Sequence, residues 1–246
     1  MLGCESEERS FVDDLLKIRD NLVRVQERVG VAAQKVGRGG EEITLIGVSK
    51  TQPAEAIRAA YEAGLRQFGE NRVQEWEGKR DALGDLKATW HLIGHLQSNK
   101  AARAAGLFHS VDSVDDLALA QRLDRARGEQ ASAQKLRVLI EVRVEQEESK
   151  SGVKPEEAAA LAGKLSEFAH LELVGLMCIP PFLEDPTKVR PYFQRLRDLR
   201  DSLVRETGHD LPVLSMGMSH DFEVAIEEGA TEVRVGTAIF GSRPAK

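Results

Sequence analysis

The segment Thr44-Leu45-Ile46-Gly47-Val48-Ser49-Lys50-Thr51-Gln52-Pro53 joins a short apolar run to a lysine and a proline. The run is rich in β-branched residues, which predicts a buried strand over residues 44–49. Pro53 predicts the first turn of a helix, because proline is favoured at that position. A buried strand that leads directly into a helix is typical of a parallel α/β sheet.

Seven further short apolar runs follow, and a helical pattern comes after nearly all of them. They cover residues 65–69, 90–94, 107–111, 136–144, 171–179, 212–216 and 232–236. Eight alternating strands and helices within about 200 residues predict a single closed (β/α)8 TIM barrel. An open doubly wound sheet is the alternative, although no G-x-G-x-x-G turn follows the first strand.

A long helix is expected before the barrel, over about residues 10–36. Apolar side chains recur there at spacings of three and four, which marks one face of a helix. They are Phe11, Leu15, Ile18, Leu22, Val25 and Val29. Gly30 or the glycines within residues 37–40 are expected to end this helix. No linker rich in proline and glycine divides the chain, so residues 1–246 are expected to form a single domain.

Short polar residues are expected to cap two of the barrel helices, because their side chains accept hydrogen bonds from the free N–H groups of a helix start. Asp112 or Ser113 would begin a helix that runs to Arg127. Ser219 would begin a helix that runs to Glu228.

The composition excludes several classes of protein. The 246 residues carry a formal net charge of −6 with a pI near 5.6, whereas a nucleic-acid-binding protein shows a basic stripe. No apolar run approaches the ~18–20 residues of a membrane span. Cys4 and Cys178 are far apart in the sequence, and no disulfide is expected between them. A reducing, cytoplasmic setting fits this pattern.

Lys50 is expected at the C-terminal end of a buried strand, where a charge is unusual. Burial disfavours the ammonium form, so the pKa of this lysine is expected below its usual range. A lysine tuned in this way is a nucleophile that can form a Schiff base. The alternative is a side chain that simply reaches solvent from the strand end.

The active site of a (β/α)8 barrel lies at the C-terminal ends of its strands. The chain places polar or small residues at several of these ends, and we expect them to converge in space. They are Lys50, Asn71, His91, Ser215, Met216, Gly217, Arg234, Gly236 and Thr237.

Two loops at this end are expected to bind phosphate, because barrels often place a phosphate site after the seventh and eighth strands at a helix N-terminus. Residues 215–219 lead into a helix, and Gly217 would let backbone N–H groups approach an anion. Gly236 would let the backbone approach the anion at a second place, and Thr237 adds a hydroxyl. The alternative for each loop is an ordinary capped helix or turn. Two such loops beside Lys50 point to a phosphate-bearing aldehyde.

Arg234 lies two residues before Gly236 and is expected on the same face of its strand. A fixed cation there would face the ring nitrogen of a pyridine cofactor and keep that nitrogen unprotonated. This would weaken the electron sink on which amino-acid chemistry depends. The alternative is an arginine in a surface ion pair.

Other charged groups are expected to have ordinary roles. His91 and His95 have H-x3-H spacing but lie on a strand and in a loop, so no metal site is expected. Lys79 and Arg80 are expected to be surface charges of a helix. Residues 147–152 are expected to form a solvated loop, although they follow a strand end and could cover the site.

Seven motifs follow one another along the chain: Val48-Ser49-Lys50-Thr51; Phe68-Gly69-Glu70-Asn71 with Val73-Gln74-Glu75; Trp90-His91-Leu92-Ile93-Gly94 with Leu96-Gln97-Ser98-Asn99-Lys100; Ser149-Lys150-Ser151-Gly152; Gly175-Leu176-Met177; Ser215-Met216-Gly217-Met218-Ser219; and Val233-Arg234-Val235-Gly236-Thr237-Ala238-Ile239-Phe240-Gly241. Together they resemble the YggS/PROSC-type pyridoxal 5′-phosphate (PLP) homeostasis proteins.

The resemblance implies a single barrel similar to the N-terminal domain of alanine racemase. It implies PLP held as an internal aldimine on Lys50, with Asn71 near the ring and Arg234 near the pyridine nitrogen. It further implies phosphate contacts from residues 215–219 and from Gly236 and Thr237. One departure stands out, because the family pattern has an asparagine near the position of Arg143.

The resemblance also implies a cytoplasmic protein that holds, buffers or delivers PLP without an established catalytic activity. PLP-dependent apo-enzymes would be its possible partners. The second domain of racemases is not expected in this chain, which favours a monomer. One alternative is a PLP-dependent amino-acid racemase, for which His91 or Tyr61 would have to act as the opposing base. Another is a phosphosugar enzyme in which Lys50 forms a Schiff base with a substrate carbonyl.

Overall fold

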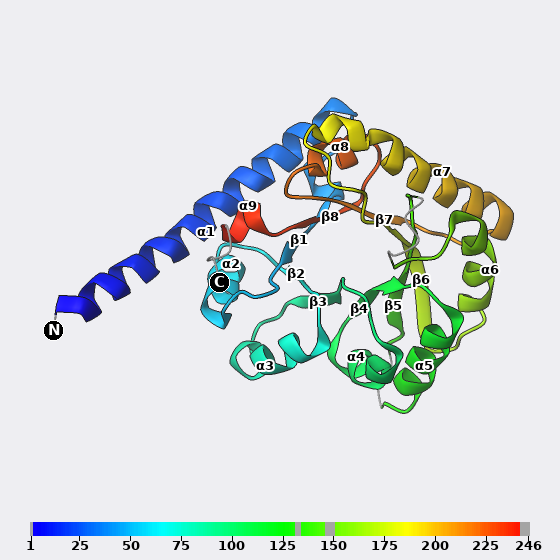
Figure 1. Ribbon diagram of the computed structural model, residues 1–246, viewed down its shortest axis with the longest axis horizontal. Coiled ribbons are helices and arrows are strands. Elements are labelled where there is room, and N and C mark those ends of the chain that lie inside the picture. Colours follow the sequence, from blue (N-terminus) through cyan, green and yellow to red (C-terminus); the bar gives the residue numbers. More distant parts are fainter. Residues whose placement is uncertain (1, 131–133, 146–150, 242–246) are drawn as a thin grey trace.

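Eight parallel strands form a closed barrel in which consecutive strands are neighbours (Figure 1). The computed structural model describes residues 2–130, 134–145 and 151–241, with residues 2–15 described by their backbone alone. The strands are β1 (Thr44–Val48), β2 (Gln67–Glu70), β3 (Thr89–Leu92), β4 (Ser110–Val114), β5 (Leu136–Glu141), β6 (Leu171–Met177), β7 (Val213–Met218) and β8 (Glu232–Val235). Pairing of β1 with β8 closes the ring. The predicted (β/α)8 barrel is therefore confirmed.

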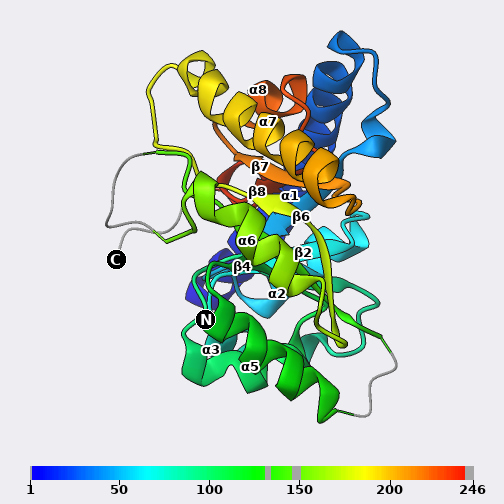
Figure 2. The same ribbon diagram turned by 90° about the vertical axis from the view of Figure 1, so that its right-hand side faces the viewer.

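Helices surround the barrel on its outside. They are α1 (Leu2–Lys35), α2 (Ala54–Glu62), α3 (Val73–Leu83), α4 (Ala101–Leu107), α5 (Leu117–Gly128), α6 (Pro155–Leu165), α7 (Arg190–Thr207), α8 (Phe222–Glu227) and α9 (Thr237–Phe240), with 3-10 turns η1 (Gly40–Glu42), η2 (Ser98–Lys100) and η3 (Pro186–Val189). Figure 2 shows α5, α6 and α7 side by side against the strands. Over the described part of the chain, no helix is long and apolar enough to cross a membrane.

Side chains alternate along each strand between the barrel interior and the surrounding helices. Phe68 and Trp90 point outward, with ring centroids 5.2 Å apart, and Trp76 of α3 stacks on Trp90 at 3.6 Å. The next residue on β3, His91, points inward and lies 3.0 Å from Oε1 of Gln67 on β2. The interior of this barrel is therefore partly polar, whereas the layer beneath the helices is apolar.

The long helix α1 covers one side of the barrel, and its N-terminal end extends beyond it (Figure 1). Ile18, Leu22, Val25 and Val29 are buried on one face of α1, as their spacing predicts. The amide of Asn21 donates a hydrogen bond of 2.9 Å to the Ile239 carbonyl of α9. The predicted helix before the barrel is confirmed, although it begins at Leu2 and not near residue 10. It ends at Lys35, just before the glycines within residues 37–40, and not at Gly30.

The predicted start of the helix after the fourth strand is wrong. Asp112 and Ser113 lie inside β4, and the helix begins at Leu117 with the side chain of Asp116 accepting from Leu119 N–H at 2.7 Å. Asp112 is fully buried because it faces the barrel interior and bonds to His91 there. A buried aspartate with an inward-facing partner cannot be told from a helix cap by local sequence alone.

Ser219 does not cap the helix after the seventh strand either. Asp221 occupies the residue before α8, and its carboxylate accepts from Met218 N–H at 2.6 Å. The Ser219 hydroxyl instead accepts from Gly236 N–H at 3.1 Å and from Ala238 N–H at 3.3 Å. Ser219 therefore ties the loop after β7 to the loop after β8.

We expect α1 to be an integral part of the folded barrel rather than an appendage. Substituting Leu22→Ala removes a fully buried side chain from its contact with the barrel, which should lower the free energy of unfolding by about 2–5 kcal/mol. The adjacent Val23 is 46% exposed, so Val23→Ala should change it by less than about 0.5 kcal/mol. Urea denaturation of both variants measures this, and equal effects would contradict the packing described.

Candidate functional site

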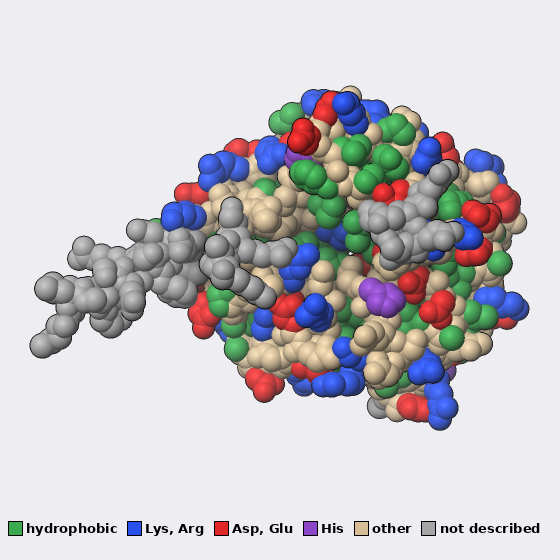
Figure 3. Space-filling view, in the orientation of Figure 1, with side chains coloured by type: hydrophobic (Ala, Val, Ile, Leu, Met, Phe, Trp, Pro, Cys, Tyr) green, Lys and Arg blue, Asp and Glu red, His purple; other side chains and the backbone are tan. Residues whose placement is uncertain are grey.

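One face of the molecule is hollowed near its centre, and Lys or Arg atoms lie in the hollow beside hydrophobic side chains (Figure 3). This face looks onto the ring of strands drawn in Figure 1. The ends of the strands thus surround one opening.

Lys50 lies in a tight turn two residues after the end of β1 and is half-buried. The turn is closed by a hydrogen bond of 3.0 Å from Gln52 N–H to the Ser49 carbonyl. Alternation along β1 directs Ile46 and Val48 toward the barrel axis, and Ser49 beyond them is buried. Lys50 lies in the turn after the strand, and contact of its side chain with the opening stays a prediction.

Arg234 is buried inside the barrel and joins three strands. One terminal nitrogen of its guanidinium donates to Ser215 Oγ of β7 at 2.7 Å. The other donates to the carbonyl of Cys178, which follows β6, also at 2.7 Å. Only 3% of Arg234 is exposed, so it is not the surface ion-pair residue of the alternative interpretation. A fixed cation with further N–H groups is thus held in the barrel.

The loop after β7 has a backbone shape that glycine makes possible. Gly217 has a φ of +93°, and a Cβ atom on it would lie 2.9 Å from the Phe222 backbone and 2.6 Å from Cβ of Ala225. Met216 points the other way and is buried in the apolar layer outside the barrel, so only its backbone can face the opening. Ser215 is fully buried against Arg234.

The loop after β8 lies directly beside the loop after β7, because both bond to Ser219. Gly236 follows β8, and Thr237 is exposed as the first residue of α9. Thr237 is the first residue of α9, so its N–H group has no acceptor within that helix. This N–H group and the Thr237 hydroxyl are thus available to an anion beside the two loops.

Asn71 lies at the end of β2 and lines a cavity of about 410 Å³ between the ends of β2 and β3. Its carbonyl packs so closely on Gly94 that a Cβ atom there would lie only 2.5 Å away. Gln97 and Lys100 line the same cavity. Asn71 is therefore on the rim where the sequence predicts it, with its backbone fixed by the strand next to it.

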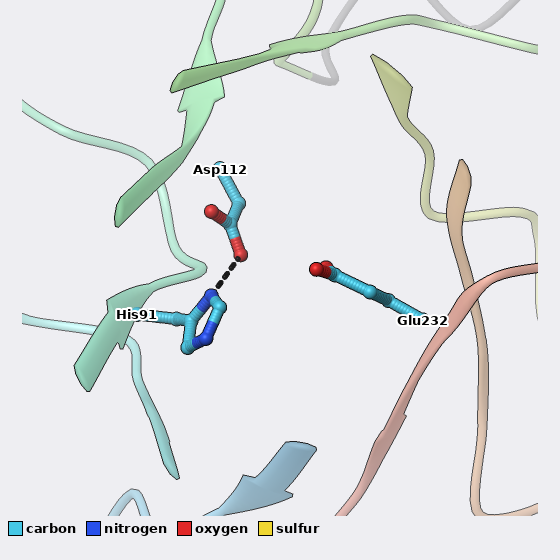
Figure 4. A group of neighbouring side chains, drawn as sticks. All are labelled: His91, Asp112 and Glu232. Carbon is cyan, nitrogen blue, oxygen red and sulfur yellow. Dashed lines mark hydrogen bonds and ion pairs between the residues drawn. The ribbon is translucent and has the colours of Figure 1, made fainter. Parts of the chain in front are cut away.

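His91 lies inside the barrel and points toward Asp112 and Glu232 (Figure 4). Its Nδ1 lies 3.1 Å from Oδ2 of Asp112, and its Nε2 lies 3.0 Å from Oε1 of Gln67. The Ser110 hydroxyl donates to the other oxygen of Asp112. Both ring nitrogens of His91 are thus engaged, and contact between His91 and a cofactor stays a prediction.

Burial and opposite charge act together in this interior group. Burial lowers the pKa of His91, but the Asp112 carboxylate beside it outweighs this effect and raises the pKa above its usual value. Burial, and then the charge of Asp112, raise the pKa of Glu232, whose Oε2 atom has no hydrogen-bond partner among the described residues. The charges of His91, Arg137 and Arg234 oppose this rise. The ligand atoms of the three residues lie within 4.8 Å of one another, and the absence of a metal from this group stays a prediction.

The ends of β5 and β6 carry a further cavity of about 240 Å³, lined by Glu141, Arg143, Ser151 and Ile179 among others. Glu141 accepts from the Ser151 hydroxyl at 2.8 Å, and burial raises the pKa of its carboxyl. Arg143, at the position of the family's asparagine, donates to the Gly152 carbonyl at 3.1 Å. Residues 147–150 of the loop predicted over 147–152 lie outside the described residues.

Several residues of the site were not predicted from the sequence. Gln67, Asp112, Glu141 and Glu232 all face the interior or the opening of the barrel and are bonded to, or charged beside, predicted residues. The available signal is their spacing within apolar runs: a polar residue at every second position of a buried strand indicates a polar barrel interior.

The buried carboxyl of Glu232 predicts a pH effect on stability. Because its pKa is raised in the folded state, the protonated form is favoured by folding. The resulting stability is full below the unfolded pKa of about 4.3 and is lost as pH rises through the folded value. Glu232→Gln should therefore gain stability relative to the wild type as pH rises from about 4 to 8.

Urea denaturation at several pH values measures this difference. The matched control is Glu172→Gln, which changes an exposed glutamate on β6, and its pH profile should run parallel to that of the wild type. A Glu232→Gln profile that also runs parallel would contradict the raised pKa.

Comparisons with known proteins agree with this geometry. The family model described as the N-terminal domain of alanine racemase matches residues 14–244. The pyridoxal phosphate homeostasis protein of Aquifex aeolicus is 50% identical over 224 residues, which cover 91% of this chain and 97% of that protein. The Pseudomonas aeruginosa protein of the same name is 46% identical over 226 residues, covering 92% and 96% of the two chains.

A solved structure of PipY from Synechococcus elongatus PCC7942, with PLP bound, superposes with a TM-score of 0.78. It is 40% identical in sequence, and the match covers 88% of this chain and all of PipY (100%). With a family model over nearly the whole chain and relatives at 46–50% identity, the chain belongs to the family of pyridoxal phosphate homeostasis proteins.

Proposed function

We propose that this chain binds PLP in the barrel opening, covalently through Lys50, and buffers or delivers the cofactor in the cell. The observation that carries the proposal is the buried guanidinium of Arg234, fixed by Ser215 Oγ and the Cys178 carbonyl at 2.7 Å each. It lies on the strand paired with β1, which leads to Lys50. A cation and an amine on adjacent strands match the two ends of a pyridine aldehyde.

The residues of the two neighbouring loops fit the phosphate of the cofactor. The N–H group of Thr237 at the start of α9 and the exposed Thr237 hydroxyl supply donors that an anion requires. Gly217 lets this loop pack directly on α8, because its φ of +93° and its contact with Phe222 leave no room for a side chain. The PLP-bound state of the related PipY supports the same cofactor.

When bound, PLP supplies an aldehyde for the Lys50 amine and a ring nitrogen for a hydrogen-bond donor. Arg234 would hold that ring nitrogen unprotonated, because a guanidinium donates and does not give up its proton. Asn71 would contact the ring from the end of β2. His91 would support the site from the barrel interior through its contacts with Gln67 and Asp112. It would not use a free ring nitrogen to bind the cofactor.

We further propose that the chain is not an enzyme. A racemase needs a second acid–base group on the opposite face of the cofactor. Of the two candidates, His91 is buried with both nitrogens engaged, and Tyr61 of α2 packs against Arg66, whose guanidinium carbon lies 4.1 Å from its ring centroid. Relatives named as homeostasis proteins rather than as enzymes support this proposal.

The remaining parts of the proposal concern the state of the protein in the cell. We propose a cytoplasmic monomer that folds as a single domain over residues 1–246. PLP-dependent apo-enzymes are its proposed recipients, because a covalently held aldehyde can be passed to another amine.

Mixing the purified protein with PLP should give a visible absorption band that borohydride reduction fixes to a Lys50 peptide. Lys50→Ala should lose the reducible linkage, because no other amine is proposed in the opening. Lys164→Ala is the matched control, since Lys164 is an exposed lysine of α6. Absorption spectra and mass spectrometry of the reduced peptides measure both effects.

A Lys50→Ala protein with the full band and a reduced linkage elsewhere would contradict the assignment of the lysine. A wild-type protein that stays colourless with added PLP would contradict PLP as the cofactor and would favour a phosphosugar carbonyl as the ligand.

The protein loaded with PLP should not interconvert D- and L-alanine above the rate of free PLP, because no second acid–base group is offered. A chiral amino-acid assay measures this. Turnover that depends on Lys50 and exceeds the rate of free PLP would make the protein an enzyme and overturn this part of the proposal.

A further inference from the structure

The backbone on both sides of Lys50 is held by side chains of one helix. The peptide group before Lys50 contains the Ser49 carbonyl, which accepts a hydrogen bond of 2.9 Å from Nζ of Lys79. The peptide group after Lys50 contains the Thr51 N–H, which donates to Oε1 of Glu75. Glu75 and Lys79 lie four residues apart on α3, and their charged groups are 3.2 Å apart.

These contacts fix the backbone of Lys50 from both ends. The two peptide planes that flank a residue define its φ and ψ angles, and those angles set the direction of its Cβ atom. With both planes held, the side chain of Lys50 starts from one defined direction. The prediction that Lys79 is an ordinary surface charge is therefore wrong: its side chain is only 13% exposed and makes three polar contacts.

Lys79 is itself held by a fully buried carboxylate. Oε1 of Glu70, at the end of β2, accepts from Lys79 Nζ at 3.0 Å and from Ser49 Oγ at 2.7 Å. Burial raises the pKa of Glu70, and the charge of Lys79 opposes this rise. Because a buried carboxylate without a partner is costly, Glu70 and Lys79 each keep the other in place.

The helix that carries Glu75 and Lys79 is firmly attached to the barrel. Trp76, between them in sequence, stacks on Trp90 of β3 and donates from its indole nitrogen to the Leu107 carbonyl at 3.1 Å. The two charged side chains thus extend from a fixed base. Movement of the Lys50 turn relative to β2 and β3 would require breaking these contacts.

The backbone of Thr51 is held in a conformation that threonine disfavours. Its φ is +64°, and among the described residues it is the one non-glycine residue with a positive φ. A β-branched residue in this region is strained, and such strain persists where surrounding contacts over-determine the backbone. The contact from Glu75 to the N–H of this residue is such a contact.

We propose that Glu75 and Lys79 are positioning residues that pin the two peptide groups around Lys50 and hold its amine ready for the cofactor. This inference rests on the proposed function for the identity of the cofactor. The pinning itself is a property of the cofactor-free protein and can be measured without PLP.

Hydrogen exchange of the cofactor-free protein tests the pinning. Glu75→Leu removes the acceptor of Thr51 N–H and leaves the Glu70–Lys79 pair intact, so the fold should persist. The amides of Thr51 and Gln52 should then exchange at least about tenfold faster. Glu77→Leu is the matched control on the same helix, because Glu77 has a similarly exposed side chain but bonds to Arg103. It should leave the exchange of the turn unchanged.

Binding of PLP tests the positioning. Glu75→Leu and Lys79→Met should each weaken PLP binding about tenfold and slow the reducible attachment to Lys50 by a similar factor, while circular dichroism stays that of the wild type. Lys79→Arg should restore most of the binding, because a guanidinium can also donate to the Ser49 carbonyl and to Glu70. Glu77→Leu should bind as the wild type does.

The outcomes separate this inference from the proposed function. Unchanged exchange of the turn in Glu75→Leu overturns the pinning, and faster exchange with wild-type binding and attachment overturns the positioning. A failure of Lys79→Arg to recover PLP binding also contradicts the positioning role of Lys79. If wild-type protein carries no PLP on Lys50, the proposed function and the positioning for PLP both fall, and the exchange experiment still decides the pinning.

Discussion

The closed barrel forces the inward side chains of eight strands to share one interior, and in this protein several of them are charged. A buried charge is tolerated only when it is paired and hydrogen-bonded. Arg234 therefore joins β8 to Ser215 of β7 and to the carbonyl after β6, and His91 joins β3 to β2 and β4 through Gln67 and Asp112. Each contact bridges strands that are separate in the sequence. The alignment of the strand ends, and with it the geometry of the opening, depends on these interior contacts.

The architecture could be predicted because each of its units is local. Short apolar runs that alternate with helical patterns define strands and helices over a few residues, and eight such units leave few ways to form a parallel sheet. Local patterns failed where a residue's role depends on a distant partner. Asp112 resembles a helix cap until His91 is placed opposite it, and Ser219 resembles a cap until the loop after β8 lies beside it. In both cases a polar side chain that could serve its own helix serves another segment instead.

In the candidate site, too, residues whose role is set by the local sequence could be predicted, and residues whose role depends on a distant partner could not. Lys50, Arg234 and the glycine loops could be predicted from their places at strand ends, because a barrel brings all those ends to one rim. The groups that hold the interior together could not be predicted, since the Cys178 carbonyl meets Arg234, and Gln67 meets His91, only through the register of the strands. Lys79 is the clearest case. A lysine on a helix is usually solvated, and only the packing of α3 by Trp76 brings this one beneath the Lys50 turn.

The distribution of rigidity within the site bears on what such a protein can do. The groups around the opening are engaged with one another: both nitrogens of His91, the Arg234 contacts to Ser215 and Cys178, and the Glu75 and Lys79 contacts to the Lys50 turn. A general acid or base must be able to exchange its proton with the reacting atoms. A side chain whose polar atoms already hold the fold cannot do so without breaking a buried contact. The same engagement suits the holding of a cofactor, because donors that are already fixed lower the entropy lost on binding.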